Sequence, residues 1–455
     1  MGWKRWKLST TRIIALGFLI GIIIGSVLLS LPIASRNGQA LAYIDALFVA
    51  TSALCVTGLS TVTLVEQFTV FGQLVILVLI QFGGLGIVTF TTTVLLLLRK
   101  RIALSDRLLI QDAYNLDTLD GIVKMTVRII KGTLLVEFAG AVLYTFVFIP
   151  KYGFGKGCYY ALFHAVSAFC NAGMDLLGDS SLIGYQTHVL MNVTTMLLIV
   201  LGGIGFPVWW DVLGIGKRVC NKEIKLHQFW QRLSLHTKLV IWMSSCLILV
   251  GTIVVFVFEY RNPATIANLS FGDKVLVSLF QSVTTRTAGF MTVPQESLKD
   301  ATAFFSLLLM FVGGSPSSTA GGVKTVTVAL ILLSTISLVR EKKDIEAFGR
   351  KIPANYLRRG LAVIIVSFSC LVINTILLLY SEQKDLLTTI YETTSAFATV
   401  GLTRNMTAGL SVMGKWIVIV SMYLGRIGPI TMALAFNAKK HRNSGTLPEG
   451  KILVG

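Results

Sequence analysis

Charged residues are scarce in this sequence. Asp, Glu, Lys and Arg together make up 14% of its 455 residues, against about a quarter in an ordinary soluble domain. The low share excludes that class. A disordered chain is also excluded, because 54% of the residues are apolar and such chains are poor in large apolar side chains.

Motifs for metal, redox or ATP chemistry are missing as well. The six cysteines show neither a CxxC pair nor the spacing of metal ligands, and most lie in apolar runs. We expect them to be buried small apolar residues: Cys55, Cys158, Cys170, Cys220, Cys246 and Cys370. No GxxxxGK[ST] motif occurs, so the sequence offers no P-loop through which ATP could power the protein directly.

What the sequence has instead is apolar runs long enough to cross a bilayer, which takes about 20 residues. The first, residues 13–33, follows a basic N-terminus and lacks a small-residue cleavage site, which favours a retained helix over a signal peptide. The chain carries 40 basic against 22 acidic residues, a formal net charge of +18. Most basic residues cluster within 4–12, 99–131, 217–238, 340–359 and 439–451, beside the apolar runs.

This distribution of charge is typical of a multi-pass membrane protein whose basic segments stay in the cytoplasm. It therefore predicts contact with membrane lipids, a location in the cell membrane and both termini in the cytoplasm. Nucleic-acid binding is not expected, because the basic residues flank membrane spans.

The apolar runs recur in a long, short, long order. The long runs are 13–33 and 70–98, 122–149 and 189–213, 239–258 and 304–338, and 361–380 and 416–436. The short runs between them, 43–55, 159–170, 274–284 and 386–397, cannot span a bilayer and are typical of re-entrant segments. We predict an all-α membrane protein with eight spanning helices and four re-entrant pore loops, in repeats 1–100, 101–218, 219–345 and 346–455, the last with a short C-terminal tail.

Each short run leads into a glycine signature. The four signatures are TSALCVTGL (51–59), HAVSAFCNAGM (164–174), QSVTTRTAGF (281–290) and ETTSAFATVGL (392–402). Their glycines recur every 112–116 residues, and a second glycine cluster follows each one after 24–29 residues, at Gly83, Gly202, Gly313 and Gly425. A fixed period marks repeated structural units, so the sequence predicts a fourfold repeat of helix, pore loop and helix.

Non-helical backbone at membrane depth has a chemical consequence. Unpaired carbonyl groups are tolerated there only where they are buried or line a water-filled cavity, and four such segments around one axis can replace the water shell of a cation. Glycine allows the backbone conformations that turn successive carbonyls toward the axis. The predicted ion-binding residues are Val56, Thr57, Gly58, Asn171, Ala172, Gly173, Thr287, Ala288, Gly289, Thr399, Val400 and Gly401.

These motifs resemble a known family. Thr399-Val400-Gly401 is similar to the start of the potassium-channel filter, and the four-repeat layout resembles the Ktr/Trk/HKT superfamily of potassium transporters over nearly the whole chain. The resemblance is strongest to the membrane-embedded subunit of a Ktr-type system: the chain opens on the first repeat, and all four repeats keep the filter glycine.

The resemblance implies potassium uptake with K⁺ in the filter, stimulation by Na⁺ and no covalent cofactor. It also implies a homodimer and a cytoplasmic, nucleotide-binding regulatory ring of the RCK type. Two alternatives stay open: a coupled sodium/potassium symporter, and an intramembrane enzyme using Ser167 and His164.

A second cluster in the third repeat predicts a block below the filter. Residues 304–338 exceed one span and are interrupted by helix-breaking Gly, Pro and Ser residues. In the resembling family the corresponding loop is the gate; a kink without a gating role is the alternative. The predicted gate residues are Gly313, Gly314, Ser315, Pro316, Ser317, Ser318, Thr319, Ala320, Gly321, Gly322, Lys324 and, from the last apolar run, Arg426.

Several charged residues lie beside these motifs. We expect Arg426 to donate to carbonyls of the loop, either to oppose cation passage or as a structural clamp, because intramembrane charges face cavities or partners. Arg286, three residues before Gly289, must turn away from a cation filter and pair, with Glu392 as a candidate. Asp175 and Asp179 follow the second signature, either gathering cations at the outer mouth or lying in a solvated loop.

Overall fold

The computed structural model describes residues 10–86 and 122–428, and these are predominantly helical. The helices are α1 (Thr10–Ser30), α2 (Tyr43–Cys55), α3 (Leu64–Gln67), α4 (Val70–Leu85), α7 (Ile122–Tyr152), α8 (Phe154–Phe169), α9 (Val189–Gly203), α10 (Phe206–Cys220), α11 (Phe229–Arg232), α12 (Leu235–Glu259), α13 (Phe271–Thr284), α14 (Asp300–Phe311), α15 (Thr325–Val339), α16 (Ala354–Glu382), α17 (Leu386–Phe397) and α18 (Val412–Ile427). The predicted all-α membrane fold is confirmed.

Among the described residues, four helices are long and apolar enough to cross a membrane without interruption. They are α1, α7, α12 and α16, the first helix of each repeat. Their outward faces expose large apolar side chains, such as Ile20 and Ile24 in α1 and Ile253 in α12. Such faces suit contact with lipid acyl chains, and the length of each helix fits one span.

The second helices of the second and third repeats are interrupted partway along. Helix α9 meets α10 at a bend of 99° at Gly205, and α4 and α18 end at the corresponding Gly86 and Gly428. These three glycines have φ between 82° and 91°, a region that side chains with a Cβ atom rarely adopt. In the third repeat the break between α14 and α15 is longer and holds the loop 312–324.

Between the two helices of each repeat lies a short helix that matches a predicted re-entrant run. These pore helices are α2, α8, α13 and α17, and both α2 and α17 have the predicted bounds. Side chains cap two of them: Ser270 accepts from the Asp273 amide, and Asp385 accepts from the Thr388 amide at 2.9 Å. The hydrogen bond from the Thr388 amide lowers the pKa of the exposed Asp385 carboxyl, because it stabilises the ionised form.

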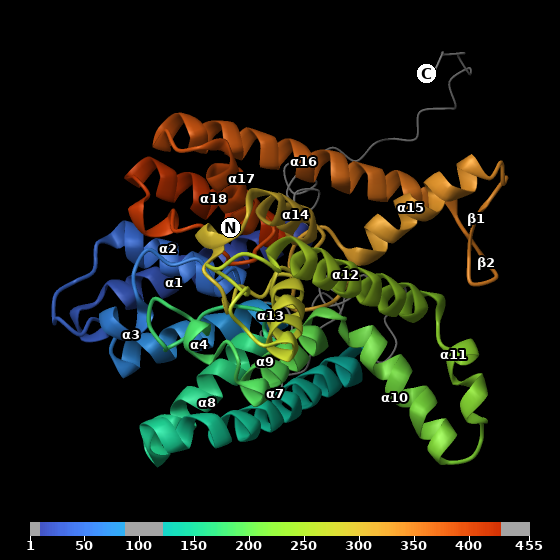
Figure 1. Ribbon diagram of the computed structural model, residues 1–455, viewed down its shortest axis with the longest axis horizontal. Coiled ribbons are helices and arrows are strands. Elements are labelled where there is room, and N and C mark those ends of the chain that lie inside the picture. The colour runs from blue at the N-terminus through green and yellow to red at the C-terminus, as the bar shows by residue number, and fades with distance from the viewer. Residues whose placement is uncertain (1–9, 87–121, 429–455) are drawn as a thin grey trace, which may run out of the picture.

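Polar contacts join each repeat to the next and close a ring. Thr63 bonds Asp179 between the first and second repeats, and the Leu182 amide donates to the Met291 carbonyl at 2.9 Å between the second and third. Tyr391 donates to Gln295 at 2.9 Å between the third and fourth. An ion pair of 2.6 Å between Lys415 and Asp45 then connects the fourth repeat back to the first. In Figure 1 the repeats accordingly surround a common centre.

A two-stranded hairpin between the third and fourth repeats was not predicted. Strands β1 (Ile345–Ala347) and β2 (Arg350–Ile352) pair antiparallel around Phe348 and Gly349, both with positive φ, as a two-residue hairpin turn of the mirror-image type requires. The Phe348 ring contacts Trp230 of α11. The hairpin, α10 and α11 project together at the right-hand end of Figure 1.

The structure leaves some predictions untested and corrects another. The first repeat beyond residue 86, the C-terminal tail and the repeat boundary at 100/101 lie outside the described residues. Cys55 and Cys170 are buried, and Cys158 and Cys370 are half-buried. The prediction of burial was wrong for Cys220 and Cys246, which are exposed at the end of α10 and on the outer helix α12.

Candidate functional site

The four signature glycines form one closed ring. Hypothetical Cβ atoms locate them: one on Gly58 would lie 3.3 Å from the α-carbons of both Gly173 and Gly401, and one on Gly289 would lie 3.2 Å from the same two atoms. Cβ atoms on the other two glycines agree: one on Gly173 would lie 2.8 Å from the α-carbon of Gly289, and one on Gly401 would lie 3.0 Å from that of Gly58. Segments more than 100 residues apart in the sequence therefore meet around a single axis, as the fourfold repeat predicts.

Around this ring, each glycine packs against a backbone carbonyl of the neighbouring repeat. A Cβ atom on each glycine would collide with the carbonyl of the residue just before the glycine of the next repeat: Ala172 for Gly58, Ala288 for Gly173, Val400 for Gly289 and Thr57 for Gly401. The first three of these distances are 2.5–2.6 Å. Glycine is thus required for two reasons: a Cβ atom would not fit beside the neighbouring carbonyl, and a φ of 65–100° is rare for residues with a Cβ atom.

The residue two positions before each glycine adopts the same unusual conformation. Val56, Asn171, Thr287 and Thr399 have φ of 54–62°, a region that is a genuine outlier for β-branched residues. Strain of this kind costs about 1–3 kcal/mol per residue and is found at functional sites. In each segment a residue with positive φ is followed two positions later by a glycine with positive φ, so the backbone of all four segments turns in the same way. Sequence reasoning assigned this freedom to glycine alone and did not predict it.

A hydroxyl near the end of each pore helix braces the segment that follows. Ser52 accepts from the Gly58 amide and Ser395 from the Gly401 amide, both at 3.0 Å. Ser167 accepts from the Met174 amide at 3.1 Å and donates to its carbonyl at 2.6 Å, and Thr284 donates to Phe290. The sequence signal was a hydroxyl residue five or six positions before each glycine.

These contacts argue against the enzyme alternative. The Ser167 hydroxyl is engaged by the filter segment, and His164 bonds the Tyr160 carbonyl at 2.7 Å. A serine that braces a filter strand is not placed as a nucleophile.

The second glycine clusters fit the inner helices against the pore helices. A Cβ atom on Gly83, Gly202 or Gly425 would collide with the carbonyl of Leu54, Phe169 or Phe397, respectively. Each of these carbonyls lies four residues before the filter glycine of its own repeat. The clusters are thus explained by close packing beside the pore-helix ends.

The loop 312–324 lies directly against this assembly. The Ser315 amide donates to the Gly203 carbonyl at 2.9 Å, and the Phe206 amide donates to the Ser317 carbonyl at 3.0 Å. A Cβ atom on Gly321 would collide with the Thr399 hydroxyl and lie 2.9 Å from the Ala398 carbonyl. The loop therefore contacts the bend between α9 and α10 of the second repeat and the residues that follow the fourth pore helix, α17.

Two half-buried cations hold carbonyls that the loop leaves without helical partners. Arg426 donates through Nη1 to the Thr319 carbonyl at 2.6 Å and through Nη2 to the Gly83 carbonyl. Lys324 donates to the Ala320 carbonyl at 2.8 Å. The predicted contact of Arg426 with loop carbonyls is present, and it also reaches the first repeat.

The chain matches known proteins over nearly its full length. The family model described as TrkH, cation transport protein, matches residues 14–445. The chain belongs to the TrkH family of cation transport proteins. It is 40% identical to the Ktr system potassium uptake protein B of Bacillus subtilis (strain 168), over 99% of this chain and 98% of that protein.

Two further comparisons agree with this TrkH-family assignment. The chain is 37% identical to the potassium/sodium uptake protein NtpJ of Enterococcus hirae, over 99% of this chain and 98% of the relative. The crystal structure of the potassium transporter TrkH from Vibrio parahaemolyticus superposes with a TM-score of 0.74 over 96% of this chain and 87% of that one, at 18% identity. That likeness supports the fold. Membership of a family of ion transporters also means that the protein is not an enzyme.

Arg286 turns away from the axis of this TrkH-family filter, but its predicted partner was wrong. Its guanidinium donates to Ser244 of the outer helix α12 at 3.1 Å. Glu392 instead accepts from Thr403 and Thr407 of its own repeat, because its side chain points to the loop that follows the filter.

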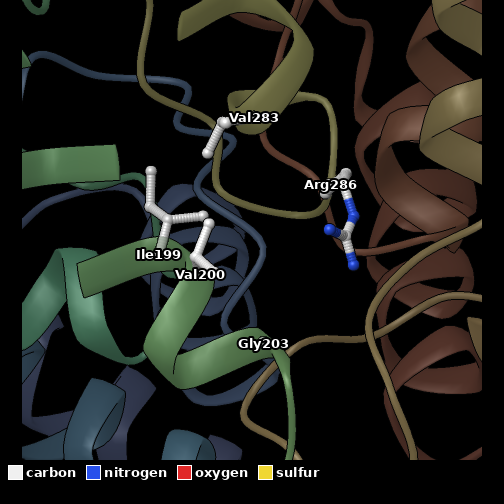
Figure 2. Close-up of a pocket in the computed structure, with 5 residues that line it drawn as sticks. All are labelled: Ile199, Val200, Gly203, Val283 and Arg286. Atoms are coloured by element: carbon white, nitrogen blue, oxygen red, sulfur yellow. The ribbon is translucent and has the colours of Figure 1, made fainter. Parts of the chain in front are cut away.

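A small cavity lies beside this arginine. It measures about 10 Å³ and is lined by Ile199, Val200, Gly203, Val283 and Arg286 (Figure 2). The Arg286 Nε atom has no partner among the described residues. A volume of this size holds about one water molecule.

The two acidic residues after the second filter segment have local partners. Asp175 accepts from the Leu177 amide at 2.9 Å, and Asp179 accepts from Thr63. Asp179 therefore links two outer loops.

Proposed function

We propose that this protein takes up potassium ions across the cell membrane through the ring of four filter segments. The observation that carries the proposal is the interlocked ring of Thr57, Ala172, Ala288 and Val400 carbonyls around the four glycines. Fixed carbonyl dipoles can replace the hydration shell of a monovalent cation. The names of two relatives, a Ktr potassium uptake protein and a potassium/sodium uptake protein, support the same substrate.

The pore helices add to this selectivity for positive charge. Each ends where its filter segment begins, as α2 does at Cys55 and α17 at Phe397. The C-terminal end of a helix carries a partial negative charge of about half an electron. Four such ends around one axis favour a cation over an anion.

The loop 312–324 acts as the gate in this proposal, with Arg426 as the residue that opposes passage while the loop is in place. The loop contacts the filter ends at Asn171 and Thr399, and Arg426 bonds its backbone. A cation leaving the filter toward the cytoplasm would meet both. A guanidinium on that route repels a second cation, so displacement of the loop must precede flux.

Regulation comes from a separate cytoplasmic subunit in this proposal. Basic residues gather on α10, α11 and the hairpin, at one end of the molecule (Figure 1). They offer a contact face for a nucleotide-binding ring of the RCK type. The proposal also includes a homodimer, cytoplasmic termini and stimulation by sodium, with no covalent cofactor.

Rubidium-86 uptake tests the function. The purified chain is placed in vesicles and assayed with an outward potassium gradient, with and without sodium. We expect uptake that potassium competes away, and no uptake by variants with Gly58, Gly173, Gly289 and Gly401 replaced together. Uptake that is unaffected by these replacements would reject the filter.

A coupled sodium/potassium symporter is the second candidate, favoured by the similarity to the potassium/sodium uptake protein NtpJ. The filter backbone fits both mechanisms. Reversal potentials separate them: a channel follows the potassium gradient alone, and a symporter shifts with sodium at a fixed stoichiometry.

A further inference from the structure

Thr319 has more contacts outside the loop than its position in a flexible Ser/Gly-rich stretch suggests. Its amide donates to the Gly202 carbonyl at 3.2 Å, and its carbonyl accepts from Arg426 at 2.6 Å. Its hydroxyl lies 3.1 Å from the Phe169 carbonyl and 3.2 Å from Asn171 Oδ1. The residue is fully buried, and all of its polar groups are satisfied by the second and fourth repeats.

Two neighbouring hydroxyls in the loop behave differently. Ser318 donates to the Ser315 carbonyl at 2.7 Å, and the Ser315 hydroxyl lies 2.9 Å from that of Thr325. These bonds stay within the loop and the start of α15. They shape the loop without attaching it to the filter.

The partner of Thr319 is itself a filter residue. Asn171 lies two positions before Gly173, has a φ of 59° and donates from Nδ2 to the Arg286 carbonyl at 3.5 Å. A Cβ atom on Gly202 would lie 2.8 Å from both Asn171 Oδ1 and the Thr319 hydroxyl. The absence of a side chain at Gly202 therefore leaves room for the contact between Asn171 and Thr319.

We propose that Thr319 is the positioning residue that holds the loop against the filter, and that its bond to Asn171 couples loop release to the inner end of the filter. The proposal rests on the potassium-conducting function proposed above. When the loop moves, Thr319 leaves Phe169 and Asn171 together. The Asn171 amide oxygen then loses its hydroxyl partner and becomes available at the inner mouth of the filter.

Thr319→Val tests this coupling, because it keeps the shape of the side chain and removes the hydroxyl. The assay is rubidium-86 flux in vesicles containing the full chain without a regulatory subunit, normalised to the amount of protein. We expect basal flux to rise about threefold to tenfold, the range expected for loss of one ordinary hydrogen bond from the shut state, because the hydroxyl has a single proton that Phe169 and Asn171 share. Thr319→Ser should restore the wild-type rate. Thr335→Val is the matched control, because it makes the same change of side chain outside the loop, where the Thr335 hydroxyl donates to the Ile331 carbonyl of its own helix α15.

The partner side of the bond gives a second, independent variant. Asn171→Val places there the residue that the first repeat carries at the same position, Val56. It should raise basal flux and also change the rubidium/sodium flux ratio, which a purely structural role for Thr319 would not predict. Because both substitutions break one bond, the double variant should resemble the stronger single variant.

The outcomes separate the two proposals. If the wild-type chain shows no rubidium flux that potassium competes away, the proposed function fails, and the coupling fails with it. If the wild type conducts but Thr319→Val has wild-type basal flux, or if the effects of the two substitutions multiply, only the coupling is wrong. Should Thr319→Val fail to reach the membrane, Asn171→Val and its flux ratio decide alone.

Discussion

Replacing one filter glycine by alanine should disrupt the filter and reduce ion flux. At Gly289 the new Cβ atom would lie 2.5 Å from the Val400 carbonyl and 3.2 Å from the α-carbons of Gly173 and Gly401. The φ of 79° adds about 1–2 kcal/mol of backbone strain for a residue with a Cβ, and forcing a methyl into a packed site adds about 1–3 kcal/mol. Since about 1.4 kcal/mol corresponds to a factor of ten, the conducting arrangement should be at least about tenfold less populated.

The assay is rubidium-86 uptake at limiting substrate, with protein amount measured in the same vesicles. Gly178→Ala is the matched control: its φ is 106°, but no heavy atom lies within 4 Å of the added Cβ. We expect uptake to fall at least tenfold for Gly289→Ala and much less for the control. Equal uptake by Gly289→Ala and the wild type would refute the argument that the four carbonyls form a closed ring.

Three further changes probe the surroundings of the ring. Arg426→Gln removes a guanidinium that pairs two carbonyls at membrane depth, and it should alter both rubidium flux and its regulation. Ser395→Ala removes the bond to the Gly401 amide, worth about 0.5–1.5 kcal/mol, and should lower the rubidium/sodium flux ratio. Asp385→Ala removes a helix cap and should destabilise the protein in detergent by about 0.5–2 kcal/mol, measured by thermal unfolding. Because the pKa of Asp385 is lowered in the folded protein, its contribution is present above the ordinary value of about 3.9 and is lost as pH falls below it.

Each of these changes has a contradicting result. Unaltered flux and regulation in Arg426→Gln would exclude a gating role and leave a structural clamp. Ser421→Ala is the control for Ser395→Ala, because the Ser421 hydroxyl is buried without a partner among the described residues; an equal effect of both would argue against the brace. A wild-type melting temperature for Asp385→Ala at neutral pH would show that the cap is not needed.

The helices were predictable because their signals are local. Apolar length separates spanning from re-entrant helices, and the short runs matched α2, α8, α13 and α17 to within a few residues at most ends. Glycine clusters in the sequence marked where the second helices end or bend, but the sequence did not show which contacts the bends allow. The bend of 99° between α9 and α10 serves a contact with the loop of the third repeat, more than 100 residues later in the chain.

Partners of buried polar groups were harder to predict, because they depend on how the helices pack and not on the local sequence. Arg286 was expected to pair with Glu392, yet its guanidinium donates to Ser244 of the outer helix α12 in the same repeat. Ser167, weighed as a nucleophile, braces a filter segment. In both cases the type of residue suggested a role, an ion pair for the arginine and a nucleophile for the serine. The folded structure instead gives each side chain a hydrogen-bond partner that is not adjacent in the sequence.

By itself, the sequence determined the membrane environment, the fourfold repeat and the four glycines, because hydropathy, spacing and residue type are properties of the chain before it folds. Only the tertiary structure decided that these glycines face one another, that the backbone before each is left-handed, and that Thr319 and Arg426 attach the loop to the other repeats. The physical reason is distance. A carbonyl at membrane depth needs a partner within about 3 Å, and which residue supplies it depends on how the four repeats close around their axis.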